Sequence, residues 1–240
     1  MAYYKYYFNS TELPGSAERI RAKNRLVYDL LDRHLRSSAP VLELGVGKGW
    51  FAELCREHGH PYQGVEGSEE QCRALAGQGF DVMCGQVPPV PVQAPESGFG
   101  LIYSAHLLEH LPGSQAVHRL LLECSELLGD HGVAAMLFPD AMAMGEHFWN
   151  CDYTHSFPTT ERRVAQAMAD AGLQVIATHR LCGHYTGGRR MLARIGSRPL
   201  VLRAAQMMAF SPERKDIFYR GWMYLQQDIL MMARMRTAAG

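Results

Sequence analysis

The stretch Pro40-Val-Leu-Glu-Leu-Gly-Val-Gly-Lys-Gly-Trp-Phe51 decides the fold. Residues 41–44 form a short apolar run that is typical of a buried strand, and a helix is expected over roughly 48–58. Three glycines fall in the turn between them: Gly45, Gly47 and Gly49. They let the backbone turn tightly and approach a ligand that a Cβ would meet. Because ligands of open α/β sheets bind beyond the carboxyl ends of the strands, this loop is a candidate binding site.

Short apolar runs and amphipathic segments continue to alternate along the chain. Further strands are expected over 62–66, 80–84, 99–104, 132–138 and 173–178, and helices over 16–36, 68–78, 114–128 and 159–171. Residues 87–98 hold four prolines and are expected to be irregular. Short apolar strands that alternate with helices predict an α/β fold, a parallel sheet with helices on both faces.

The last part of the chain, residues 185–240, is less regular. Helices are expected over 198–209 and 213–225. The segment Asp228-Ile-Leu-Met-Met-Ala-Arg234 either continues a helix or returns as an edge strand, and we favour the strand. A methionine cluster in this region predicts core packing or a homodimer interface; its members are Met207, Met208, Met223, Met231, Met232 and Met235.

Composition indicates a folded chain of 240 residues, of which 47% are hydrophobic. No uninterrupted apolar run is long enough for a membrane span, and the N-terminal sequence lacks the pattern of a signal peptide. The six cysteines have no C-x-x-C spacing, which predicts reduced thiols in a cytoplasmic protein. The aromatic start, Tyr3 to Phe8, is either a lid over a ligand or a tail packed on the domain.

The charges are unevenly distributed although the net charge is zero. Residues 1–184 carry 14 Lys and Arg against 21 Asp and Glu, whereas residues 185–240 carry 10 against 3. The basic region is either a solvated surface or a wall that faces an anionic substrate or an acidic membrane surface.

The glycine spacing excludes two common nucleotide sites. Trp50 stands where the G-x-G-x-x-G pattern of nicotinamide binders needs its last glycine, and no G-K-[ST] of a phosphate loop follows. Glu66, at the end of the second strand, can accept hydrogen bonds from both hydroxyls of a ribose. Together the loop and Glu66 favour a nucleoside ligand, although Glu66 could also be an exposed loop carboxylate.

The motifs VLELGVGKG, VEGSEE, CGQV and FGLIYSAHLLEHL resemble, in this order, those of class I S-adenosylmethionine (SAM) methyltransferases. The resemblance covers roughly residues 38–182. It implies a Rossmann-like, seven-stranded, mostly parallel sheet whose last strand is antiparallel, and SAM as cofactor. The domain organisation that we expect is an N-terminal helical lid (1–37), the SAM-binding core (38–184) and a basic helical extension that returns to the sheet (185–240).

The resemblance also implies roles for individual residues. Glu43 and the three glycines would cradle the methionyl part and the ribose, and Glu66 would hold the ribose hydroxyls. The residues expected beside the adenine or along the cofactor are Gly85, Gln86, and Ser104 to His106. This chain departs from the family pattern twice, because Gln86 and Gly100 stand where an aspartate is common. The first change is expected either to weaken the contact with the adenine amine or to place it on the Gln carbonyl, and the second is expected to affect local structure.

The segment Trp149-Asn-Cys-Asp-Tyr-Thr-His-Ser-Phe-Pro158 follows the fifth strand, on the cofactor side of the sheet. It resembles part of the acceptor pocket in methyltransferases of bacterial surface glycans and natural products. The resemblance implies methyl transfer to a small-molecule or glycan acceptor, anionic if the basic region faces it, in the biosynthesis of such compounds. A nucleic-acid substrate is not expected, because the fourth strand lacks an N/D-P-P-Y motif.

A hydroxyl acceptor must lose its proton, and histidine is the usual base near neutral pH. His155 is the first candidate, with Asp152 orienting it or binding substrate. His106 and His110 compete with it. His110 could instead be a helix-start residue that packs and hydrogen-bonds locally, and His155 could instead stabilise its loop. A metal set of His147, Asp152 and His155 matches no strong ligand signature, so no metal is predicted. The alternative function is a SAM-fold protein that binds or regulates without methyl transfer.

Overall fold

The computed structural model describes residues 15–208 and 211–236, and the aromatic segment Tyr3 to Phe8 lies outside them. The helices are α2 (Ser16–Asp32), α3 (Trp50–Glu57), α4 (Glu69–Gly77), the 3-10 helix η1 (Leu108–His110), α5 (Ser114–Leu127), α6 (Ala141–Met144), α7 (His147–Asn150), α8 (Glu161–Asp170), α9 (Gly187–Gly196), α10 (Pro199–Met207) and α11 (Pro212–Met223). The strands are β1 (Val41–Leu44), β2 (Tyr62–Glu66), β3 (Val82–Cys84), β4 (Phe99–Ala105), β5 (Leu128–Pro139), β6 (Leu173–Cys182) and β7 (Gln227–Met235).

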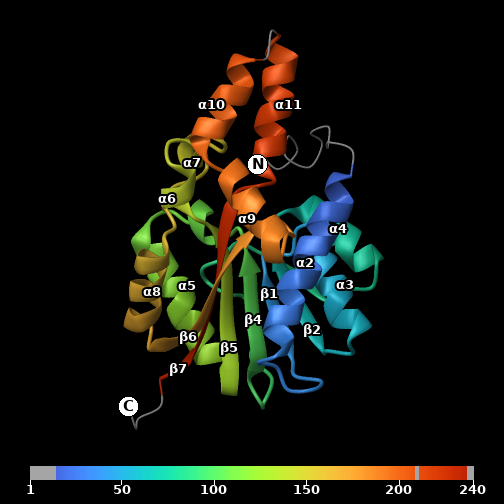
Figure 1. Ribbon diagram of the computed structural model, residues 1–240. Helices are drawn as coiled ribbons and strands as arrows, with labels where there is room; N and C mark the ends of the chain where they lie inside the picture. Colours follow the sequence, from blue (N-terminus) through green and yellow to red (C-terminus); the bar gives the residue numbers. More distant parts are fainter. Residues whose placement is uncertain (1–14, 209–210, 237–240) are drawn as a thin grey trace.

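The strands form one seven-stranded sheet in the order β3-β2-β1-β4-β5-β7-β6. The pairs from β3 through β5 are parallel, and β7 is antiparallel to both of its neighbours (Figure 1). The predicted Rossmann-like sheet is therefore confirmed, including the strand at 228–234. Because β7 lies between β5 and β6, all the other strands end at the same edge of the sheet.

Each face of the sheet carries its own core, because alternate residues of a strand point to opposite sides. On one face α2 and α3 pack on β1, β4, β5 and β7, with Tyr28, Phe51 and Tyr103 among the buried side chains. On the other face α5 and α8 pack around Phe138 and Met231. The central strands β1, β4, β5 and β7 are therefore largely buried on both sides, as the sequence indicated.

Gly100, one of the two departures from the family pattern, lies where β4 begins beside β1. A Cβ at this position would be only 2.5 Å from the Cβ of Ala39, closer than two carbon atoms can pack. Its backbone N–H donates to the carbonyl of Pro40 at 2.8 Å. Glycine here serves the close approach of two chain segments, in agreement with the expected local effect.

The segment between β6 and β7 adds a helical excursion at the carboxyl edge of the sheet. It contains α9, which the sequence did not predict, and the expected helices α10 and α11, which project beyond the sheet as a hairpin (Figure 1). Many apolar side chains are exposed on these helices, among them Leu192, Leu200 and Met207. No helix in the described part of the chain is both long and apolar enough to span a membrane.

The expectation that all six cysteines are reduced is wrong for one pair. Cys72 in α4 and Cys84 at the end of β3 form a disulfide, with their Cα atoms 5.9 Å apart. The packing of α4 beside β3 brings the two residues within disulfide reach, although their spacing in the sequence carries no recognised signal. The other four cysteines are free.

Phe138 is expected to be a main contributor to stability, because its ring is fully buried in the core between β5 and α8. Phe138→Ala should reduce the free energy of unfolding by about 3–5 kcal/mol. Phe218→Ala is the matched control, since that ring is 43% exposed. Urea unfolding measures both variants, and an equal loss of stability in the two would contradict the assigned core.

Candidate functional site

The loops that follow β1, β2, β4 and β5 meet at the carboxyl edge of the sheet. A Cβ on Gly45 would lie 3.7 Å from the side chain of Leu107, so the glycine loop borders the segment after β4. The backbone N–H of His106 donates to the carbonyl of Leu137 at 2.8 Å, which fastens the segment after β4 to β5. The candidate cofactor residues and the candidate bases therefore share one edge.

The glycine loop has the shape of a ligand cradle. Gly47 has a φ of +59°, and among the described residues other than its chain neighbours no atom lies within 4 Å of where its Cβ would be. Gly49 has a φ of +78°, and a Cβ there would lie 2.6 Å from a methyl group of Leu75. Gly49 is thus needed for packing, whereas the open space beside Gly47 is available to a ligand.

Glu66 is buried and fixes the glycine loop from the neighbouring strand. One carboxylate oxygen accepts the N–H of Gly47 at 2.8 Å, and the other accepts the N–H of Ser68 at 2.9 Å. The structure therefore excludes the alternative of an exposed loop carboxylate. Each oxygen keeps a lone pair for a ribose hydroxyl.

Glu43 is also buried, and its carboxyl group accepts a 2.6 Å hydrogen bond from the hydroxyl of Tyr62. The pKa of Glu43 is raised to about 8, mainly by burial. The hydrogen bond from Tyr62 lowers the pKa in part, and the charge of Glu66 adds to the increase. Burial also raises the pKa of Tyr62, so its hydroxyl remains a donor. Sequence reasoning missed Tyr62, which no motif signals.

Gly85 and Gln86 follow β3, next to the Glu66 turn. The N–H of Gly85 donates to the carbonyl of Glu66 at 3.0 Å, and the side-chain amide of Gln86 donates to the carbonyl of Gly67 at 3.2 Å. With its NH₂ group engaged, Gln86 offers its side-chain carbonyl as an acceptor. An adenine amine could donate to that oxygen, as the sequence analysis expected.

Ser104 is fully buried near the end of β4. Its hydroxyl is oriented along the sheet and donates to the sulfur of Met136 in β5 at 2.9 Å. Any contact of this residue with a cofactor would therefore come from its main chain.

His106 has the left-handed backbone of a tight turn, with a φ of 52°. Its Nε2 lies 3.2 Å from the ammonium group of Lys23, which also pairs with Asp228. Because an ammonium group only donates, Nε2 must accept, and Nδ1 carries the proton towards the Glu109 carboxylate at 3.3 Å. The lone pair that a general base needs is thus engaged.

His110, at the end of η1, is tied to the loop that follows β5. Its Nδ1 lies 2.7 Å from the hydroxyl of Thr154, and this hydroxyl donates to Asp152 at 2.7 Å. Asp152 also accepts the N–H of Thr154. Asp152 therefore orients His110 through Thr154, whereas its hydrogen bond with His155 is one of the backbone, from the N–H of His155 to the Asp152 carbonyl at 3.3 Å. Burial lowers the pKa of His110, although Glu109 raises it in part, which favours the neutral ring.

His155 lies against His110, with the two ring centroids 4.9 Å apart. Its Nδ1 is 2.6 Å from the backbone carbonyl of Phe148. The position of the loop is set by Ser156 and Phe157, whose N–H groups both donate to the carbonyl of Glu109. The structure thus brings His155 and His110 together, from loops that are far apart in the sequence.

Glu109 is the residue of this edge that sequence reasoning missed. Its side chain is fully buried, and its second carboxylate oxygen has no hydrogen-bond partner among the described residues. The available signal was an acidic residue inside the apolar run L-L-E-H-L. A buried carboxylate without a full set of partners is costly unless a ligand completes it.

The metal set considered from the sequence is not assembled. His147 packs its ring against Trp222, and both of its nitrogens are buried with no hydrogen-bond partner in the part of the chain that the structure describes. Asp152 is engaged by Thr154. Within the described residues, the group that could hold a metal ion consists of Glu109, His110 and His155, and it shares only His155 with that set.

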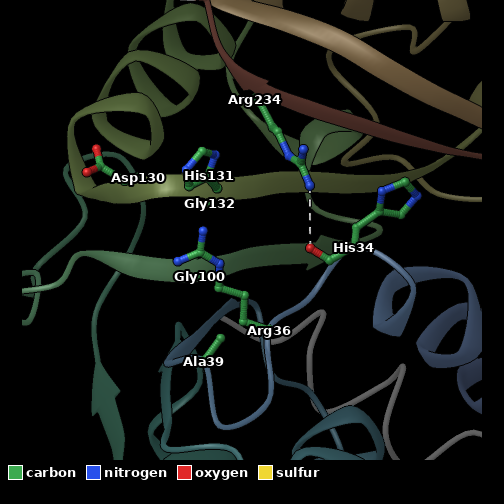
Figure 2. A pocket seen from close by; sticks show the side chains of 8 residues that line it. All are labelled: His34, Arg36, Ala39, Gly100, Asp130, His131, Gly132 and Arg234. Atoms are coloured by element: carbon green, nitrogen blue, oxygen red, sulfur yellow. Dashed lines mark hydrogen bonds between the residues drawn. The ribbon is translucent and has the colours of Figure 1, made fainter.

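A pocket of about 240 Å³ lies elsewhere, where the strands begin (Figure 2). It is lined by His34, Arg36, Ala39, Gly100, Asp130, His131, Gly132 and Arg234, and Arg234 donates to the carbonyl of His34. This is the edge opposite the glycine loop. Since open α/β sheets bind their ligands at the carboxyl ends of the strands, we assign it no part in the site.

Gly47→Ala is expected to weaken SAM binding about 10–100-fold, because the added methyl group occupies the open space of the cradle. Gly59→Ala is the matched control, since Gly59 has a φ of +72°, equally open surroundings and a position at the opposite edge. Both variants carry the backbone strain of a left-handed residue, about 1–2 kcal/mol. Calorimetry with SAM separates them, and equal affinities would contradict the cradle.

Glu43 is expected to make the ligand-free protein less stable at alkaline pH. Its pKa is about 8 in the folded state against an ordinary 4.5, so the stability present below pH 4.5 is lost as the pH rises through about 8. Glu43→Gln stays neutral, and its Tm should therefore decline less than that of the wild type from about pH 6 to 9. The exposed Glu57→Gln variant is the control. Parallel Tm profiles of wild type and Glu43→Gln would disprove the expected titration.

Comparison with known proteins agrees with this geometry. A family model described as a methyltransferase domain matches residues 16–178. No curated protein matches the chain in sequence. The fold is shared with a SAM-dependent methyltransferase from Archaeoglobus fulgidus, with a TM-score of 0.61 and 19% identity over 90% of this chain and 96% of that one.

Two other solved structures have the same fold at low sequence identity. A SAM-dependent methyltransferase from Mesorhizobium loti has a TM-score of 0.60 and 16% identity over 86% of this chain and 96% of that one. The 4+2 cyclase SpnF has a TM-score of 0.60 and 15% identity over 90% and 81%. The family match covers well over half of the chain, and the protein therefore belongs to the methyltransferase-domain family, with S-adenosylmethionine as its expected cofactor.

Proposed function

We propose that this protein transfers a methyl group from SAM to a hydroxyl of a small-molecule or glycan acceptor, in natural-product or surface-polysaccharide biosynthesis. The observation that supports it is the group of Glu109, His110 and His155, one ligand atom of each lying within 4.8 Å of the others at the cofactor edge. A thiol or amine acceptor needs little help with its proton, whereas a hydroxyl does.

The residues of the edge fit SAM and divide the work. When bound, SAM supplies an electrophilic methyl group on a sulfonium sulfur. The open space beside Gly47 and the spare lone pairs of Glu66 suit the cofactor's nucleoside part. The loop 151–158 orients the acceptor. The imidazole pair and Glu109 assist the departure of the hydroxyl proton.

The class of acceptor follows from the charges around this edge. The excursion between β6 and β7 starts and ends here, and Arg189 and Arg190 on α9 are exposed. Exposed cations near a site attract anionic substrates by long-range electrostatics. We therefore favour an anionic acceptor, such as a sugar that carries a phosphate or a carboxylate. We also propose that the exposed methionines of this excursion form a homodimer interface.

A second candidate function is cofactor binding without methyl transfer. The fold neighbour SpnF is named a cyclase, so the fold by itself does not establish the reaction. The intact glycine loop and Glu66 support cofactor binding in both cases. The proposed reaction differs from this alternative by consuming SAM, and release of S-adenosylhomocysteine on addition of hydroxylated acceptors is the deciding measurement.

His155→Ala is expected to lower kcat by about 10²–10⁴ and to leave SAM affinity unchanged, the range for losing proton-transfer assistance. His155→Gln tests whether shape alone suffices, because it has an amide but no basic nitrogen. His118→Ala is the control, since His118 lies on α5 outside the group. An assay of S-adenosylhomocysteine release with a panel of sugar and phenol acceptors measures kcat. Full activity of His155→Ala would remove this residue from the mechanism.

A further inference from the structure

Three side chains at the cofactor edge each bring one possible ligand atom close to the other two. Glu109 and His110 come from η1, and His155 comes from the loop after β5. One oxygen or nitrogen of each lies within 4.8 Å of the corresponding atoms of the other two. The loop and η1 are held together by backbone hydrogen bonds from Ser156 and Phe157 to Glu109, so the group is a fixed part of the fold.

The hydrogen bond of His155 determines its tautomer. Its Nδ1 is 2.6 Å from the carbonyl oxygen of Phe148, and a carbonyl can only accept. Nδ1 must therefore carry a proton and donate it. In the neutral ring Nε2 is left with a free lone pair.

The tautomer of His110 is also determined by a hydrogen bond, here one to the hydroxyl of Thr154. The hydroxyl proton of Thr154 is donated to Asp152, so the oxygen of Thr154 accepts from Nδ1 of His110. Nε2 of His110 is then also unprotonated in the neutral ring. Metal-binding histidines typically have their second nitrogen held in this way by a carbonyl or by a carboxylate-linked group.

Glu109 completes the set with a negative charge. Its side chain is fully buried, and its Oε2 has no partner among the described residues. Its Oε1 accepts from Nδ1 of His106 at 3.3 Å, and in the described part of the chain no lysine or arginine forms an ion pair with it. Two imidazole lone pairs and a buried carboxylate oxygen are three acceptors for which the described residues provide no donor, an arrangement that a cation satisfies.

We propose that Glu109, His110 and His155 bind one divalent first-row transition-metal ion, through Nε2 of each histidine and a carboxylate oxygen. Two nitrogens and one oxygen suit Mn²⁺, Fe²⁺, Co²⁺ or Zn²⁺ better than Mg²⁺ or Ca²⁺, which prefer oxygen ligands. Three protein ligands leave coordination positions open for a substrate oxygen. The role of the ion rests on the proposed function: an acceptor hydroxyl bound to it would ionise more easily and lose its proton to water.

The test is a titration of the chelator-treated full chain with Co²⁺ alone. We expect one ion per chain, with an absorption spectrum of nitrogen and oxygen ligation. NMR of the Co²⁺ protein should show two strongly shifted exchangeable protons, the Nδ1–H groups of His110 and His155. A thiolate-to-cobalt band would assign the ion to Cys151, whose sulfur lies 3.9 Å from His155, and would overturn the proposed ligands.

Variants separate ligands from their supports. Glu109→Gln, His110→Ala and His155→Ala should each weaken Co²⁺ binding at least about 100-fold, and each histidine variant should lose one shifted proton. Thr154→Val should weaken binding about 10–100-fold, because it frees the ring of His110. His118→Ala is the matched control and should bind like the wild type. Calorimetry with SAM checks that each variant is folded, and Co²⁺ binding unaffected by Glu109→Gln would overturn the proposal.

The experiments test the metal site and the proposed reaction separately, so that either hypothesis can fail without the other. If the wild type binds no Co²⁺ with or without SAM, the metal site is wrong, whatever the activity. If the metal-free protein methylates a hydroxyl at the full rate, the ion has no part in the proposed function, and the inference about its role is overturned. If Co²⁺ binds to these ligands but no hydroxyl acceptor is ever methylated, the metal site stands and the proposed function fails.

Discussion

The carboxylate of Glu66 joins two loops that would otherwise be separate, and the cofactor edge depends on this junction. It accepts the N–H of Gly47 from the loop after β1 and the N–H of Ser68 from the turn after β2. A buried carboxylate needs such partners, and bonds to a charged acceptor are stronger than neutral ones. The left-handed glycine loop is thereby held in a single conformation from outside.

A second junction fixes the opposite side of the edge. The carbonyl of Glu109 accepts the N–H groups of Ser156 and Phe157, which places the loop after β5 over η1. The orientation of His110 and His155 follows from that contact, through Thr154 and Phe148. The backbone of Glu109 thus organises the loop, while its side chain places a buried carboxylate beside the two imidazoles.

The insertion of β7 between β5 and β6 connects the ends of the chain to the same edge. Because β7 is antiparallel, it begins at the carboxyl edge, where Asp228 pairs with Lys23 of α2. The helices α9 to α11 must leave from and return to this edge. The part of the chain with the excess of positive charge is therefore adjacent to the loops that carry the site.

The strands, most of the helices and the candidate cofactor residues could be predicted from the sequence. Apolar periodicity and glycines act locally, so they are readable along the chain. The helix α9 was missed, because the segment after Cys182 has no comparable pattern. The antiparallel last strand came from the family resemblance and from an apolar run that was also compatible with a helix.

Contacts between side chains of different elements could not be predicted from the sequence and are seen in the folded structure alone. The contact of Glu109 and His110 with His155, the bond from Tyr62 to Glu43 and the disulfide of Cys72 with Cys84 all join residues from different elements. No spacing rule in one sequence encodes such contacts, because they depend on how two loops or a helix and a strand pack. The tautomers of His110 and His155 are the property hardest to predict from the sequence, because each depends on an oxygen atom that the fold places next to Nδ1.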